Sequence, residues 1–164
     1  MLLSEQAYQK IDRELTKFPG DRQQSAIMAA LAIAQDEKGW VSADIIADVA
    51  AYLHVPPIAV QEVATFYNMF NTHPTGRFKI TVCTNLPCAL RDGVKAADYL
   101  KEKLGIGFHE TTPDGLFTLM EGECMGACGD SPVMTMNNKH MCVRMSQDKI
   151  DTMIQELKQH GESA

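Results

Sequence analysis

The sequence predicts a protein of the α/β class, with an N-terminal four-helix bundle in residues 1–76 and a small α/β domain in residues 77–164. Apolar residues recur at helical spacing before Gly76, whereas alternation with a period of two begins only after it. The breaker-rich segment 71–76 separates the two patterns and is typical of a linker. At 164 residues, the chain can bury a core of its own without a metal ion.

Each of the four expected helices has a start signal and a stop signal. The residues expected to cap or open the helices are Ser4, Asp21, Ser42 and Pro57. The residues expected to end them are Gly20, Gly39, His54 and, for a fourth helix running to about Phe70, the linker. Short turns between amphipathic helices favour packing as a bundle.

The second part of the chain alternates strands with helices. The expected strands are Phe78–Val82, Leu116–Met120, Pro132–Met136 and Lys139–Val143. Between the first two, a helix is expected to place Leu90, Val94, Ala97, Leu100 and Leu104 on one buried face and to end at Gly105. The pair Asn137-Asn138 tolerates positive φ and suits a tight hairpin, and Ser146 is expected to cap a last helix.

Composition excludes several classes of protein. The formal net charge of −6 argues against a nucleic-acid partner, which would require a basic surface. The longest apolar run, 26–34, is far shorter than the roughly 20 residues needed to span a bilayer, so no membrane insertion is expected. The N-terminus shows no signal-peptide pattern. These observations predict a soluble protein in a reducing compartment. In such a compartment, clustered cysteines favour metal or redox chemistry over structural disulfides.

Two cysteine loops dominate the α/β part. The first is a C-x4-C loop from Cys83 to Cys88, and the second is a C-x3-C loop from Cys124 to Cys128. Each comes directly after a predicted strand, so the four thiolates can converge on one soft metal centre. The fifth cysteine, Cys142, lies in an apolar strand context and is expected to be a buried, inert thiol.

Spacing alone leaves the kind of centre open. Both loops lie within the spacings that zinc sites tolerate, and a pair of disulfides or a redox dithiol is a further alternative. Among iron–sulfur clusters, [2Fe–2S] is favoured over [4Fe–4S], since the C-x2-C-x2-C run is missing. Histidine ligands are not expected, because residues 54, 73, 109, 140 and 160 share no metal-binding spacing.

Three motifs in order carry a resemblance that covers nearly the whole chain. The tract from Gln61 to Phe70, the first cysteine loop, and the second loop with Pro132 resemble the 24 kDa subunit family of NADH–quinone oxidoreductase, respiratory complex I. The resemblance implies a thioredoxin-like ferredoxin domain after the helical bundle. It also implies one [2Fe–2S] cluster, with the ligands Cys83, Cys88, Cys124 and Cys128.

The resemblance also implies a function. The subunit would exchange single electrons with the FMN of the adjacent flavoprotein subunit, which also binds NADH. It would lie on the cytoplasmic or mitochondrial matrix face, beside other peripheral-arm subunits. Residues 105–107 lack the third glycine of a dinucleotide fingerprint, so no substrate site of its own is expected. The alternatives are a diaphorase subunit of an NAD-linked hydrogenase or formate dehydrogenase, a zinc-stabilised interaction module, and a thioredoxin-like redox enzyme.

Two finer expectations concern charge and exposure. Glu121, Glu123 and Asp130 flank the second loop and neither loop contains a basic residue, so a low reduction potential of roughly −400 mV is predicted. The aromatic residues Phe66 and Tyr67 fit either the bundle core or a face that packs on the flavoprotein partner, and we expect them in the core.

Overall fold

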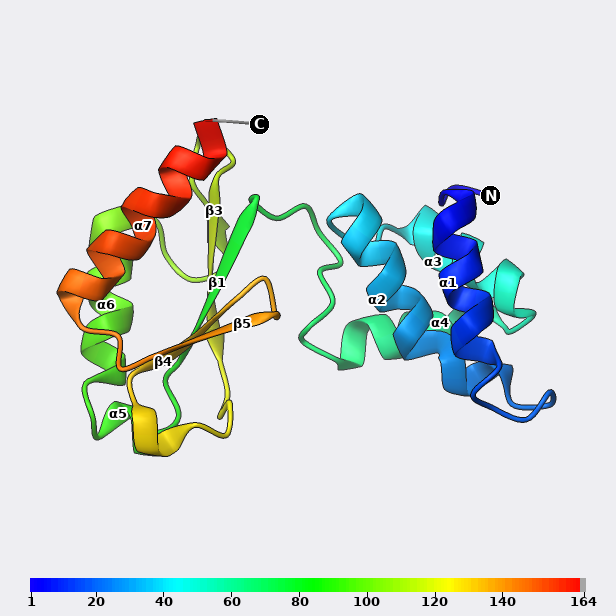
Figure 1. Cartoon of the computed structure of the whole chain (residues 1–164), viewed down its shortest axis with the longest axis horizontal. Coiled ribbons are helices and arrows are strands. Elements are labelled where there is room, and N and C mark those ends of the chain that lie inside the picture. The colour runs from blue at the N-terminus through cyan, green and yellow to red at the C-terminus, as the bar shows by residue number, and fades with distance from the viewer. Residues whose placement is uncertain (163–164) are drawn as a thin grey trace. The chain divides into compact units, whose positions relative to one another are not determined.

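The chain forms two compact units in the computed structural model, Met1–Pro74 and Thr75–Ala164. The structure describes the backbone of residues 1–162 and the side chains as far as Gln159, so the expectation for His160 lies outside the described side chains. Within residues 1–162 there are seven α-helices and one five-stranded sheet, which confirms the α/β class (Figure 1). None of the helices in this range is both long and apolar enough to cross a membrane.

Four α-helices and a short 3₁₀ turn make up the first unit, Met1–Pro74. They are α1 (Glu5–Leu15), the turn Gln23–Ala26, α2 (Ile27–Lys38), α3 (Ala43–Leu53) and α4 (Pro57–Phe66). All four α-helices contribute to one hydrophobic core, whose fully buried side chains include Ile11, Leu31, Val49, Leu53 and Val60.

The helix ends follow most of the sequence signals. The Ser4 hydroxyl accepts a hydrogen bond from the Ala7 amide at 3.2 Å, and Ser42 caps α3 in the same way. Gly39 ends α2 with a φ of 83°, and Pro57 opens α4. The prediction for Asp21 was wrong, because the 3₁₀ turn precedes α2 and no side chain caps that helix.

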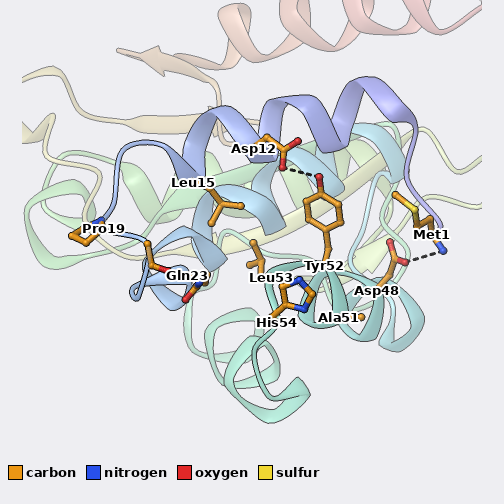
Figure 2. A pocket seen from close by; sticks show the side chains of 11 residues that line it. Met1, Asp12, Leu15, Pro19, Gln23, Asp48, Ala51, Tyr52, Leu53 and His54 are labelled. Atoms are coloured by element: carbon orange, nitrogen blue, oxygen red, sulfur yellow. Dashed lines mark hydrogen bonds and ion pairs between the residues drawn. The ribbon is translucent and has the colours of Figure 1, made fainter.

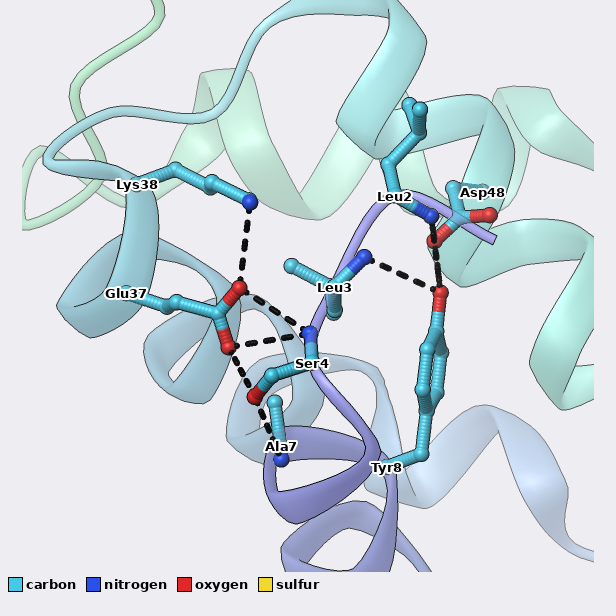
Figure 3. A network of polar contacts seen from close by, with 8 residues as sticks. All are labelled: Leu2, Leu3, Ser4, Ala7, Tyr8, Glu37, Lys38 and Asp48. Atoms are coloured by element: carbon cyan, nitrogen blue, oxygen red, sulfur yellow. Dashed lines mark hydrogen bonds and ion pairs between the residues drawn. The ribbon is translucent and has the colours of Figure 1, made fainter.

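A polar network holds the N-terminal segment against α2 and α3 (Figure 3). The Ser4 hydroxyl donates to the Glu37 carboxylate at 2.6 Å, and the Leu2 amide donates to the Tyr8 hydroxyl at 3.1 Å. Tyr8 in turn hydrogen-bonds to Asp48. Burial alone would raise the pKa of Asp48, but hydrogen bonds from Tyr8 and Leu2 and the nearby N-terminal ammonium outweigh burial and hold the pKa below its ordinary value.

The second unit is a sheet covered on one face by two helices (Figure 1). The strand order is β2-β3-β1-β4-β5, and only β1 and β3 are parallel among the paired strands. The strands are β1 (Phe78–Cys83), β2 (Glu110–Thr111), β3 (Phe117–Gly122), β4 (Val133–Met136) and β5 (His140–Val143). Helix α6 (Gly93–Leu104) connects β1 to the β2–β3 part of the sheet, and α7 (Gln147–Glu162) packs beside it.

The helix-covered face forms the core of the second unit. Its buried side chains come from three strands and both helices, and include Ile80, Val82, Phe117, Leu119, Met134, Leu100, Ile150 and Ile154. The hairpin between β4 and β5 has positive φ at both Asn137 and Asn138, as the sequence predicted.

Two expectations about helices were wrong, and one short strand was missed. The helix expected to include Leu90 begins only at Gly93, as α6, because Asp92 adopts a φ of 66° directly before it, and Leu90 instead follows the short helix α5 (Leu86–Ala89). Leu90 is consequently 78% exposed instead of buried. Helix α4 ends at Phe66, and the prediction of core positions was wrong for both aromatic residues, because Phe66 is 79% exposed and Tyr67 is 39% exposed. The two-residue strand β2 was not predicted.

Candidate metal centre

The two cysteine loops leave the sheet at the same edge. Strands β1 and β3 are parallel neighbours, and their register pairs Cys83 with Gly122. Each strand continues directly into its cysteine loop, with Cys88 in the short helix α5 and Cys124 just after β3. Parallel pairing therefore brings together two loops that lie far apart in the sequence.

Hydrogen bonds tie the first loop to the end of β3 and to the second loop. The Thr84 amide donates to the Gly122 carbonyl at 3.3 Å, and the Thr84 hydroxyl donates to the Glu121 carboxylate at 2.6 Å. The Asn85 side-chain amide donates to the Glu123 carboxylate at 2.7 Å. These bonds are made by residues that lie between the cysteines of the first loop or shortly before Cys124, so they position both loops without occupying the thiols.

The first pair of cysteines is buried. Cys83 is 1% exposed and Cys88 is 2% exposed, and both pack against Val133 and Met125. Burial and a hydrogen bond with Cys88 raise the pKa of the Cys83 thiol, while backbone amides of Asn85 and Met125 act in the opposite direction. The Met125 amide belongs to the second loop, so that loop contributes a donor to a sulfur of the first.

The second pair lies nearer the surface. The Sγ atoms of Cys124 and Cys128 are 3.5 Å apart. Between them Gly126 has a φ of 77°, a conformation that favours glycine, and its amide donates to Cys124 Sγ at 3.4 Å. This hydrogen bond lowers the pKa of the Cys124 thiol, whereas the hydrogen bond with Cys124 raises that of Cys128.

One glycine permits the first loop to close tightly against a helix. A Cβ atom at Gly93, the first residue of α6, would lie 2.7 Å from the Cys88 carbonyl oxygen and 3.0 Å from that of Cys83. Both neighbours are backbone atoms, so they cannot rotate out of the way as a side chain could. The first loop therefore requires glycine at this position.

The donor set fits a two-iron cluster. Among the described residues, no three side chains of His, Cys, Asp or Glu converge closely enough to hold one metal ion. The loop sulfurs occur as two pairs instead, and a [2Fe–2S] cluster takes two thiolates on each iron. Cys142 lies apart from them in β5, where it is half-buried against the helix-covered core, and this burial raises the pKa of its thiol.

Sequence reasoning missed three polar residues at the site. Ser131 is only 6% exposed, and its hydroxyl lies 3.1 Å from Cys88 Sγ and 2.9 Å from the Cys128 carbonyl oxygen. The Arg91 guanidinium donates to the Gly129 carbonyl at 3.0 Å. Arg144 forms an ion pair with Asp130 at 2.7 Å, so that carboxylate does not act on the loop as an uncompensated charge.

A separate cavity lies in the first unit, with a volume of about 670 Å³ (Figure 2). Two carboxylates point toward it, but both already have partners. Asp12 accepts a hydrogen bond from Tyr52 at 2.7 Å, and Asp48 pairs with the N-terminal ammonium at 3.3 Å. The hydrogen bond with Asp12 adds to burial in raising the pKa of Tyr52 to about 12. These contacts hold α1 to α3.

Comparison with known proteins places the chain in a family. The family model for thioredoxin-like [2Fe–2S] ferredoxins matches residues 11–158. The chain belongs to this family. The match extends through the first unit as well as the second, and it confirms the thioredoxin-like ferredoxin fold that the resemblance implied.

Two named relatives of this ferredoxin are subunits of NADH-quinone oxidoreductases. NADH-quinone oxidoreductase subunit 2 of Thermus thermophilus is 33% identical over 90% of this chain and 82% of its own length. A subunit of the NADH-quinone oxidoreductase of Rhizobium meliloti is 42% identical over 80% of this chain and 77% of its own length. The resemblance to the 24 kDa subunit family of NADH–quinone oxidoreductase is thereby confirmed.

A solved structure shares the fold at low sequence identity. In the air-oxidised NAD⁺-reducing [NiFe]-hydrogenase, a chain superposes on 87% of this ferredoxin with a TM-score of 0.73 and 19% identity. The ferredoxin spans about a quarter of that chain, 24% of its length.

Proposed function

We propose that this ferredoxin is the electron-transfer subunit of an NADH–quinone oxidoreductase and holds one [2Fe–2S] cluster on Cys83, Cys88, Cys124 and Cys128. The main support is the meeting of two cysteine pairs at the shared end of β1 and β3, in a chain of the [2Fe–2S] ferredoxin family. When bound, such a cluster accepts and releases one electron at a time.

The surrounding residues suit this role in two ways. The apolar side chains of Val133 and Met125 keep water from the buried pair. Backbone amides of Asn85, Met125 and Gly126 are directed at cysteine sulfurs, where they favour negative charge. The second pair, with Cys124 exposed and Cys128 partly exposed, is the side of the centre open to a partner protein.

The proposed partner is the flavoprotein subunit of the same complex, with FMN and NADH bound in that subunit and single electrons exchanged with the FMN. The two named relatives, both subunits of NADH-quinone oxidoreductases, support this assignment. We further propose that this chain has no substrate site of its own, that residues 1–76 and 77–164 act as separate domains, and that the subunit sits with other peripheral-arm subunits on the cytoplasmic or matrix face.

A diaphorase subunit of an NAD-linked hydrogenase or formate dehydrogenase is the second candidate. The fold shared with the NAD⁺-reducing hydrogenase favours it. The two candidates differ in the subunits that accompany the ferredoxin, so affinity purification of the native complex separates them. Co-purification with a quinone-reducing membrane arm supports the first, and co-purification with a hydrogenase or formate dehydrogenase subunit supports the second.

The decisive test of the cluster is anaerobic purification followed by a visible spectrum and assays for iron, acid-labile sulfide and zinc. We expect a red-brown protein with about two irons and two sulfides per chain, bleached by dithionite. Serine at any of the four loop cysteines is expected to alter or abolish the paramagnetic resonance of the reduced protein. Cys142→Ala is the matched control, and a colourless protein with one zinc would overturn the proposal.

A further inference from the structure

The Ser131 hydroxyl contacts both halves of the proposed ligand set. It lies 3.1 Å from Cys88 Sγ, which belongs to the first loop, and 2.9 Å from the backbone carbonyl of Cys128 in the second. The residue is buried, so water does not compete for these contacts. A buried hydroxyl with two partners is well satisfied, yet it has a single proton to share between them.

The position of that proton depends on the state of Cys88. In the free protein the hydroxyl donates to the Cys128 carbonyl, and either atom of the sulfur–oxygen contact with Cys88 can be the donor. A cysteine that ligates a metal has lost its own proton. The only proton then available between Cys88 Sγ and Ser131 Oγ is the hydroxyl proton. A hydrogen bond to an anionic sulfur is stronger than one to a neutral carbonyl, so the hydroxyl turns toward the sulfur.

We propose that Ser131 donates a hydrogen bond to the Cys88 sulfur of the cluster-bound protein and thereby raises the reduction potential of the centre. An added electron increases the negative charge on the cysteine sulfurs, so a donor stabilises the reduced form more than the oxidised form. Ser131 acts through Cys88 and is therefore a positioning residue. The inference rests on the proposed ligand set, and the effect of Ser131 partly offsets the lowering effect of the nearby Glu121 and Glu123.

The test compares midpoint potentials of the full-length, cluster-loaded protein. Ser131→Ala is expected to lower the equilibrium constant for reduction of the centre roughly threefold to tenfold, and so to lower the midpoint potential. A factor of ten corresponds to about 59 mV for one electron. Ser131→Thr keeps the hydroxyl and is expected to stay near the wild-type value. Thr118→Val is the matched control, because it removes another buried hydroxyl, one that accepts from the Gly76 amide at 2.6 Å. It is expected to lower stability and leave the potential unchanged.

The outcomes separate this inference from the proposed function. A loaded Ser131→Ala variant with an unchanged potential, or an equal shift in Thr118→Val, overturns the inference alone. A wild-type protein without a cluster overturns both. If Ser131→Ala fails to take up the cluster, a measurement on the wild-type protein still tests the proposed hydrogen bond. Brief transfer of the reduced wild-type protein into D₂O should add a deuteron coupling to its pulsed paramagnetic resonance spectrum, and a spectrum without one overturns the inference.

Discussion

The side-chain amide of Asn85 donates a hydrogen bond to the carboxylate of Glu123, with Nδ2 2.7 Å from Oε2. The two residues belong to different cysteine loops, since Asn85 lies between Cys83 and Cys88 and Glu123 directly precedes Cys124. The bond therefore helps to set the distance between the two pairs of cysteine sulfur atoms.

Loss of this hydrogen bond should make the cluster more labile toward an iron chelator. Asn85→Asp places a second carboxylate against Glu123, and we expect several-fold faster bleaching of the visible absorbance in the presence of an iron chelator. Asn85→Ala, which removes the donor without adding charge, should bleach at an intermediate rate. The double variant Asn85→Asp, Glu123→Gln exchanges donor and acceptor and should recover most of the lifetime. A double variant as labile as Asn85→Asp alone would contradict this role.

A methyl group at Gly93 should damage the first loop. Gly93→Ala forces the backbone of Cys88 and Cys83 to move, and overpacking of this kind costs about 1–3 kcal/mol. We expect a lower urea midpoint and less iron per chain after reconstitution. Gly129→Ala is the control in the second loop, because a Cβ atom there meets nothing within 4 Å. Equal iron content in the two variants would refute the prediction.

The Asp48 carboxylate should make the stability of the first unit sensitive to acid. Because its pKa is lowered in the folded state, its contribution is complete above the ordinary value of 3.8 and is lost as the pH falls through the folded value. Asp48→Asn should cost about 1–3 kcal/mol near neutral pH, and the difference from wild type should shrink below about pH 4. Urea unfolding as a function of pH measures both quantities.

The control for that experiment is Asp21→Asn, because Asp21 forms only an exposed ion pair with Arg22. Exposed pairs contribute little, so its unfolding free energy should follow the wild type at every pH. Equal pH profiles for the wild type and Asp48→Asn would show that the Tyr8–Asp48 contact does not stabilise the unit.

The exposed ring of Phe66 should matter for association and not for folding. Phe66→Gln removes apolar surface that already faces solvent, so the free energy of unfolding should change by less than about 0.5 kcal/mol. The affinity of the variant for the proposed flavoprotein partner, measured by calorimetry or pull-down, should fall. Ile58→Gln is the control, since Ile58 is also exposed on α4 but does not line the shallow pocket formed by Glu62, Val63, Thr65, Phe66 and Tyr67. Equal losses in both variants would exclude a specific role for Phe66.

Local chemistry explains which elements the sequence could predict. The caps at Ser4 and Ser42 and the turn at Gly39 depend on neighbouring residues, and the alternation that predicted β1 is likewise local. Apolar residues at helical spacing indicate that a helix would have an apolar face. The spacing does not indicate where the helix begins or ends, or whether another element covers that face. Leu90 and Phe66 were misassigned for this reason.

The cysteines of the site were visible in the sequence, while their supporting contacts were not. Loop spacing and the preceding strands indicated where Cys83, Cys88, Cys124 and Cys128 would lie, although their ligand role stays a prediction. The contact between Ser131 and Cys88 joins residues 43 positions apart and follows no periodicity. Only the register of β1, β3 and β4 brings them together.

The parallel pairing of β1 with β3 also sets the order of biogenesis. Before the chain folds, the two cysteine loops are separate dithiols, one at Cys83 and Cys88 and the other at Cys124 and Cys128. They become one four-sulfur pocket only after α6 has folded across and β3 has docked beside β1. With the proposed ligand set, iron would therefore be inserted only after tertiary folding has brought the two loops together.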